Sequence, residues 1–215
     1  MPLYQTITHN SASKIYIWKI EESFETLTNE VVLNHNSQVR LNGMKSELHQ
    51  RGFLSVRKLL QHAGYSDLDL YYDAFGKPHL NDGMHISITH SHEFSAIILS
   101  DQNTGIDIER RRDKIINIAD KFVDLESRFL DKQAHSDYIS RLTVIWGVKE
   151  SVFKICNEPG ISFKNHIQVD SFQMNDSSGF AVLKMEQVQR FFEIYFEEIE
   201  NFNLVYAFEK EQNYI

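Results

Sequence analysis

The chain has 215 residues, which suits one large domain or two small halves. Apolar residues make up 42% of the sequence, which allows a sizeable core and argues against a disordered chain. The formal net charge of −8 argues against nucleic acid as the main partner, because phosphate binding relies on a basic surface.

The sequence also argues against a membrane or secreted protein. No stretch reaches the roughly eighteen consecutive apolar residues that a membrane helix needs. The first residues lack the basic start and apolar run of a secretory signal. The single cysteine, Cys156, excludes an intrachain disulfide and fits a reducing compartment. We therefore expect a cytoplasmic protein with no membrane partner.

The first half of the chain predicts short strands around one long helix. Alternating polar and apolar residues indicate the strands, and apolar residues at helical spacing indicate the helix. We expect strands over Lys14–Ile20, Leu68–Phe75, His85–His90 and Phe94–Ser100. We expect helices over Glu21–Leu33 and Met44–His62, the latter ending before Gly64.

The second half repeats the order of a strand, a long helix and further strands. It opens with a strand over Thr104–Glu109, continues with one or two short helices over Ile115–Leu130, and has its long helix over Ser136–Cys156. Further strands are predicted over His166–Met174, Gly179–Met185, Arg190–Glu198 and Leu204–Phe208. The repeated order predicts an α+β chain with an N-terminal half over residues 1–103 and a C-terminal half over residues 104–215.

Two acidic side chains share one face of the strand over Thr104–Glu109. Side chains alternate along a strand, so Asp107 and Glu109 point to one face and Ile106 and Ile108 to the other. Two half-buried carboxylates repel each other unless a cation neutralises them, and Mg²⁺ binds oxygen ligands of this kind. The alternative is an exposed face of an edge strand.

A third carboxylate lies on the long helix of the second half. Glu150 and Lys154 are one helical turn apart, on the same side as Trp146. Together with the two strand carboxylates, this pair is what a metal-assisted phosphoryl-transfer site needs, because a cation and a lysine share the negative charge. The alternative is an ordinary surface pair at helical spacing.

The segments GKP, ITHS, GIDIE and WGVKESVFK follow one another in this order. In order and spacing they resemble the 4'-phosphopantetheinyl transferases of the Sfp type, which activates surfactin synthetase. The resemblance covers the chain from about Arg51 to about Val169. It implies a monomer built as a pseudo-dimer of two similar α+β halves, with the active site in the cleft between them.

The resemblance also implies the reaction. The family transfers 4'-phosphopantetheine from coenzyme A to a serine hydroxyl of an apo acyl or peptidyl carrier protein, and releases 3',5'-ADP. The expected cofactor is Mg²⁺, with Mn²⁺ left open. Which carrier protein is modified also stays open.

Residue roles follow from the motif positions. The family's metal ligands match Asp107, Glu109 and Glu150, and Glu150 and Lys154 are the expected catalytic residues. Glu150 is also a candidate base, either directly or through a metal-bound water. The expected coenzyme A contacts are Arg57, Lys77, Thr89, His90 and Lys154. Arg51 is the alternative to Arg57 for the 3'-phosphate.

A basic run follows the acidic strand directly. We expect it to contact the carrier protein, because local positive charge lets two acidic proteins meet. The run contains Arg110, Arg111, Arg112 and Lys114. The alternative is a solvated loop.

Two other functions compete with the transferase. Acidic residues with a nearby lysine also suit a Mg²⁺-dependent phosphodiesterase or nuclease, although the acidic net charge argues against it. A non-catalytic carrier-protein binding module is the other alternative.

Overall fold

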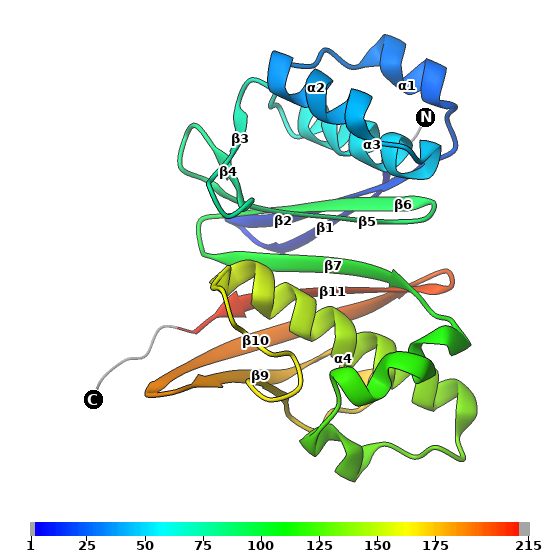
Figure 1. The fold of residues 1–215 in the computed structure, drawn as a ribbon, viewed down its shortest axis with the longest axis vertical. Coiled ribbons are helices and arrows are strands. Elements are labelled where there is room, and N and C mark those ends of the chain that lie inside the picture. The colour runs from blue at the N-terminus through cyan, green and yellow to red at the C-terminus, as the bar shows by residue number, and fades with distance from the viewer. Residues whose placement is uncertain (1–2, 211–215) are drawn as a thin grey trace. The chain divides into compact units, whose positions relative to one another are not determined.

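The computed structural model describes residues 3–210, and the chain divides into two compact units, the first ending at Gln102 and the second beginning at Asn103 (Figure 1). Each unit is described by itself. Both units combine helices with an antiparallel sheet, which confirms the predicted α+β class. The packing of the halves as a pseudo-dimer stays a prediction.

The N-terminal unit is built on a four-stranded antiparallel sheet with the order β1-β2-β6-β5. Its strands are β1 (Leu3–Asn10), β2 (Ser13–Lys19), β5 (His85–Ser91) and β6 (Phe94–Ser100). A separate two-stranded hairpin is formed by β3 (Leu70–Tyr72) and β4 (Pro78–Leu80). The helices of this unit are α1 (Phe24–Glu30), α2 (His35–Gly43) and α3 (Glu47–His62).

The helix α3 supplies five of the fifteen buried side chains in the core of the N-terminal unit. Its apolar stripe, which includes Phe53, Val56 and Leu60, is buried against Trp18 of β2 and Ile97 of β6. The amphipathic spacing of these residues predicted both the helix and its buried face.

The C-terminal unit is a five-stranded antiparallel sheet with the order β7-β11-β10-β9-β8. Its strands are β7 (Thr104–Arg110), β8 (Ile167–Val169), β9 (Ser178–Met185), β10 (Val188–Ile199) and β11 (Phe202–Glu209). The long helix α4 (His135–Cys156) runs along β7 and β11 (Figure 1). The remaining turns are the 3₁₀ helices η1 (Asp113–Lys121), η2 (Leu125–Phe129) and η3 (Met174–Asp176).

The helix α4 buries its apolar stripe against the sheet of the C-terminal unit. Leu142, Val148 and Val152 have no exposed surface, and they belong to one core with Val205 of β11. The two units have one feature of strand pairing in common. In each unit the last strand before the longest helix pairs with the last strand of that unit: β2 pairs with β6, and β7 pairs with β11.

Several elements differ from the sequence predictions. The strands β1 and β4 and the helix α2 were not predicted, and β8 is shorter than its predicted strand. The helix α2 lacks an apolar stripe, since only Ser37 and Leu41 are buried in it. Its start is fixed by the side chain of Asn34, which accepts a hydrogen bond from the backbone of Ser37 at 2.8 Å.

Within residues 3–210, no helix is long and apolar enough to cross a membrane.

Candidate active site

The helix α4 lies in direct backbone contact with β7. A Cβ atom on Gly105 of β7 would stand 2.0 Å from the carbonyl oxygen of Ser151 on α4. On the helix side, a Cβ atom on Gly147 would stand 2.7 Å from Cγ2 of Val205. Glycine at both positions therefore permits the close approach, because any side chain would collide with the neighbouring element.

This contact places Lys154 of α4 beside Asp107 of β7. The Lys154 ammonium donates to Oδ1 of Asp107 at 3.0 Å and to the carbonyl oxygen of Ile106 at 2.8 Å. Asp107 is only 5% exposed, so its charge is balanced mainly inside the unit. The structure thus brings together two of the predicted site residues.

Glu150 completes a group of acidic side chains. The pKa of Glu150 is raised from 4.5 to about 7, mainly by burial and also by the negative charges of Asp107 and Glu109, while the Lys154 ammonium acts in the opposite direction. The carboxylates of the two elements are therefore within electrostatic range of one another. Such a group is the kind that a cation neutralises.

The three predicted metal ligands fit Mg²⁺ by their chemistry but are not gathered into a coordination shell. Asp107, Glu109 and Glu150 offer hard oxygen donors, and the pKa of Glu150 is raised mainly by burial and in part by the charges of the other two carboxylates. Among residues 3–210, however, no group of three His, Cys, Asp or Glu side chains is close enough to hold a metal. In this arrangement the Lys154 ammonium pairs with Asp107 at 3.0 Å.

A cavity of about 180 Å³ lies beside Glu109 in the C-terminal unit. It has an apolar wall and a basic rim. Its lining residues are Glu109, Arg110, Arg112, Lys114, Ile115, Ile118 and Trp146. Three of the four residues predicted to contact the carrier protein therefore line one hollow, next to a predicted metal ligand.

Arg111 does not line this cavity. Its guanidinium pairs with Oε1 of Glu198 at 2.5 Å and donates to the carbonyl oxygen of Glu200 at 2.7 Å. The backbone of Arg111 also donates to the carbonyl oxygen of Asn201. These contacts tie Arg111 to the turn between β10 and β11, which separates it from its basic neighbours.

The predicted residues Thr89 and His90 lie in β5 of the N-terminal unit. Their side chains point to opposite faces of the sheet, as alternation requires. His90 lies on the same face of the sheet as α3, and its side chain is exposed. A Cβ atom on Gly52 of α3 would stand 3.0 Å from the His90 ring. Thr89 is buried. The structure therefore does not bring these two side chains to one point.

Lys77 lies at the end of a tight turn before β4. Oδ1 of Asp73 accepts hydrogen bonds from the backbone of Phe75 at 2.8 Å and of Lys77 at 3.0 Å. Gly76, between them, has a φ of 84°, which glycine adopts without strain. The half-buried Lys77 side chain is thus held on a fixed turn, as the GKP segment predicted.

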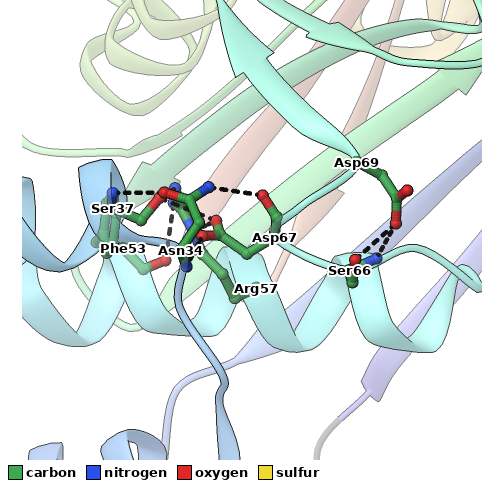
Figure 2. Close-up of polar contacts among 7 residues, drawn as sticks. All are labelled: Asn34, Ser37, Phe53, Arg57, Ser66, Asp67 and Asp69. Carbon is green, nitrogen blue, oxygen red and sulfur yellow. Dashed lines mark hydrogen bonds and ion pairs between the residues drawn. The ribbon is translucent and has the colours of Figure 1, made fainter.

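Arg57 has a different environment from the one predicted. Figure 2 shows its guanidinium inside the N-terminal unit, where Nε donates to Oδ1 of Asp67 at 2.8 Å and Nη2 to Oγ of Ser37 at 3.1 Å. Its cation also lies 3.5 Å from the centroid of the Phe53 ring. With 2% exposed surface, Arg57 is a structural residue, and we withdraw it from the set that contacts coenzyme A.

Both carboxylate oxygens of Asp67 accept hydrogen bonds within the N-terminal unit. Its Oδ2 accepts from the backbone of Asn34 at 2.8 Å, and its Oδ1 accepts from Oγ of Ser37 at 3.0 Å (Figure 2). The network joins the start of α2, the middle of α3 and the turn at Asp67. Sequence periodicity placed Arg57 on α3, but it could not show that the partner lay ten residues further along.

A buried ion pair on α4 was not predicted from the sequence. Lys149, next to Glu150, has no exposed surface and pairs with Glu126 of η2 at 2.8 Å. Burial lowers the pKa of Lys149, and the neighbouring Glu126 opposes that change. Nothing in the spacing of the two residues marks them as partners, so only the structure reveals the pair.

Comparison with known proteins gives two matches. The family model described as ACPS, 4'-phosphopantetheinyl transferase superfamily, matches residues 103–208, which contain β7, the cavity and α4. The protein 4'-phosphopantetheinyl transferase gsp of Aneurinibacillus migulanus is 29% identical over 146 residues, which is 63% of this chain and 62% of that protein. The chain therefore matches less than two thirds of the length of this curated relative.

Proposed function

Because this chain belongs to the 4'-phosphopantetheinyl transferase superfamily, we propose that it transfers 4'-phosphopantetheine from coenzyme A to a serine hydroxyl of an apo acyl or peptidyl carrier protein. The other product is 3',5'-ADP, and Mg²⁺ assists the reaction. The observation that carries the proposal is the contact between β7 and α4. It pairs Lys154 with Asp107, and the charges of both residues act on the Glu150 carboxyl group.

Three carboxylates would hold the cation. Asp107 and Glu109 supply oxygen donors from β7, and Glu150 supplies one from α4. When bound, Mg²⁺ would neutralise charge on the pyrophosphate of coenzyme A. The pKa of Glu150, raised first by burial and then by the charges of Asp107 and Glu109, supports this assignment, since a bound cation would favour the ionised carboxylate.

The transfer breaks one phosphorus–oxygen bond and forms another. The serine oxygen attacks the β-phosphorus, the bond to the α-phosphate oxygen breaks, and 3',5'-ADP leaves with the electron pair. The serine proton needs an acceptor, and Glu150 is the candidate base, either directly or through a metal-bound water. The Lys154 ammonium is the nearby cation that can stabilise the phosphate oxygens.

Coenzyme A binding is assigned to residues of the N-terminal unit. We propose Lys77 and His90 as phosphate contacts and leave out Thr89, because it is buried on the opposite face of β5 from His90. Arg51 replaces Arg57 as the candidate for the 3'-phosphate. Its Nη2 donates to the carbonyl oxygen of Ile20 at 3.0 Å, which leaves further donors of the guanidinium for an anion.

The carrier protein is proposed to meet the basic rim of the cavity beside Glu109. Arg110, Arg112 and Lys114 line that rim, and carrier proteins are acidic. Arg111 is left out of this contact, because Glu198 already pairs with it. We further propose a cytoplasmic monomer, which a measurement of molar mass in solution would test.

One experiment decides between the proposed functions. The protein is incubated with coenzyme A, Mg²⁺ and a panel of apo carrier proteins, and the intact mass of each carrier is measured. We expect a phosphopantetheine adduct on at least one carrier, and its absence after replacement of Asp107 by Asn. Cleavage of nucleic acid without an adduct would favour a phosphodiesterase, and a stable complex without modification would favour a binding module.

A further inference from the structure

The buried pair of Lys149 and Glu126 has no part in the chemistry proposed above. Lys149 lies about 100° around α4 from its neighbour Glu150, so the two side chains face different surroundings. Lys149 has no exposed surface and Glu126 has 1%. The distance between Nζ of Lys149 and Oε1 of Glu126 is 2.8 Å.

All three donors of the Lys149 ammonium have acceptors within the C-terminal unit. Besides Glu126, Nζ donates to the carbonyl oxygen of Phe122 at 2.6 Å and to that of Phe163 at 3.0 Å. Phe122 ends η1, and Phe163 lies in the loop after α4. One side chain thus holds two backbone segments that are far apart in the sequence.

Glu126 holds two more segments. Its Oε1 accepts from the backbone of Val169 in β8 at 3.0 Å, and its Oε2 accepts from the backbone of Asp124 at 2.9 Å. Both carboxylate oxygens are therefore occupied, and the pair joins α4 to η2, to β8 and to two loops.

The two phenylalanines that Lys149 holds are also those that contact Trp146. The centroid of the Trp146 ring is 5.2 Å from that of Phe122, in an edge-to-face arrangement, and 5.5 Å from that of Phe163. Trp146 in turn forms part of the wall of the cavity beside Glu109. A continuous set of contacts thus leads from the buried pair to the cavity wall.

We propose that Lys149 and Glu126 are positioning residues: by fixing the backbones of Phe122 and Phe163, they hold the Trp146 ring in the wall of the cavity that receives the carrier protein. The assignment of the cavity to the carrier rests on the proposed function. The positioning of Trp146 does not, because it is a property of the protein alone.

The positioning role of Lys149 and Glu126 is distinct from a contribution to the free energy of unfolding. Removing one partner leaves an uncompensated buried charge, which is strongly destabilising. Replacing both partners by apolar residues of similar size is often neutral or stabilising. The distinctive contribution of the pair is therefore the fixed position of the groups it binds, which apolar residues cannot hydrogen-bond.

The test uses the double variant Lys149→Met with Glu126→Leu, in a protein that also carries Trp18→Phe. The sequence has two tryptophans, so fluorescence then reports Trp146 alone. We expect the double variant to fold but to unfold at a lower temperature than its parent, because backbone groups of Phe122, Phe163, Asp124 and Val169 lose these hydrogen-bond partners. We also expect a shifted Trp146 emission, greater quenching by acrylamide, and a severalfold higher KM for the carrier with the KM for coenzyme A unchanged.

The matched control is Arg141→Met. Arg141 also lies on α4, pairs with Asp137 at 2.6 Å and holds a loop carbonyl, that of Phe172, at 2.6 Å. Its ring neighbour is Phe172 rather than Trp146. We expect the control to leave the Trp146 emission and the KM for the carrier unchanged.

A folded double variant with parental emission and parental KM for the carrier would overturn the proposal. If the double variant does not fold, Lys149→Gln with Glu126→Gln replaces it, because this pair leaves no buried charge and keeps an acceptor for the backbone of Val169, and the same change in emission is expected from the loss of the Lys149 ammonium. Absence of transfer by the unaltered protein would refute the proposed function, while the emission of Trp146 would still decide the role of the pair.

Discussion

Lys154 of α4 donates hydrogen bonds both to the carboxylate of Asp107, at 3.0 Å, and to the carbonyl oxygen of Ile106, at 2.8 Å. The helix and the strand are therefore linked at the point where the proposed site lies. Because Asp107 is almost completely buried, the ion pair contributes to folding as well as to the proposed chemistry. The two contributions can be separated by experiment.

Replacing Asp107 by Asn should lower both activity and stability. Asn keeps an acceptor for Lys154 but removes the charge, so we expect the free energy of unfolding without Mg²⁺ to fall by about 1–3 kcal/mol. Transfer should fall about 100-fold or more, because a preorganised charge is lost. Urea unfolding and the adduct assay measure the two effects. An active Asn variant of unchanged stability would remove Asp107 from the site.

Replacing Glu150 by Gln should have the opposite effect on stability. The pKa of Glu150 is raised from 4.5 to about 7 in the folded state. A raised pKa stabilises the fold fully below the unfolded value and loses that contribution as the pH rises through 7. Wild type and variant should therefore be similarly stable near pH 4.5, and the variant should be more stable at pH 8, by about 2–3 kcal/mol.

The effect of Mg²⁺ provides the control for Glu150. At pH 8 the cation should stabilise the wild type, since it neutralises the ionised carboxylates, and should stabilise the Gln variant much less. Thermal unfolding at pH 4.5 and pH 8, with and without Mg²⁺, measures both effects. Equal stability of the two proteins at pH 8 would show that Glu150 is not under electrostatic strain.

Replacing Gly105 by Ala should separate β7 from α4. The new Cβ would stand 2.0 Å from a backbone oxygen of Ser151, which a rotamer change cannot relieve. We expect the free energy of unfolding to fall by about 3 kcal/mol or more, which is at the upper end of the losses caused by overpacking a core. The control is Gly43→Ala, because a Cβ on Gly43 would meet no atom within 4 Å. Similar unfolding temperatures for the two variants would contradict the close approach.

Replacing Arg57 by Met should destabilise the N-terminal unit without a specific effect on coenzyme A. Asp67 would be left buried without its cation, which costs about 3–5 kcal/mol. Any protein that remains folded should bind coenzyme A as the wild type does. Lys77→Ala is the contrasting variant. It should leave stability unchanged and weaken coenzyme A about tenfold to a hundredfold, measured by calorimetry. A weakened affinity in the Arg57 variant alone would restore Arg57 to the ligand site.

Much of the fold follows from periodicity. The apolar residues of α3 repeat at helical spacing, so the sequence predicted this helix, whereas β6 is buried throughout and β7 over its first five residues, so burial does not alternate in these strands. The helix α2 has no such repeat, and capping by Asn34 fixes its start. The edge strand β1 alternates between half-buried and exposed side chains, which gives a weaker signal than a buried face.

Local spacing in the sequence predicts some residues of the candidate site but not the partners of its buried charges. Asp107 and Lys154 come from motifs with a fixed spacing, and β7 and α4 bring them together. Arg57 and Glu126 are buried in ion pairs whose partners depend on tertiary packing, and local spacing carries no information about these. Arg111 differs from its basic neighbours because Glu198, far along the chain, pairs with it.

Arg112 and Arg111 should differ in their effect on the carrier protein, although they are adjacent. Arg112 lines the cavity beside Glu109, whereas Arg111 is paired with Glu198. Reversing Arg112 to Glu should raise the KM for the carrier and leave the KM for coenzyme A unchanged, because rim charges act mainly on encounter. Reversing Arg111 to Glu should change the KM for the carrier much less, and should lower stability by setting two glutamates side by side.

Salt provides the second measurement for the same pair of variants. Exposed charges are screened over a distance of about 10 Å at 0.1 M salt, so added salt should raise the KM of the wild type for the carrier. The Arg112 variant has already lost part of that attraction and should respond less, while the Arg111 variant should respond as the wild type does. Steady-state kinetics at low and moderate salt, with each substrate varied in turn, measure these differences. Equal effects of the two reversals would mean that the basic run acts only through its total charge, and that the cavity has no special part in receiving the carrier.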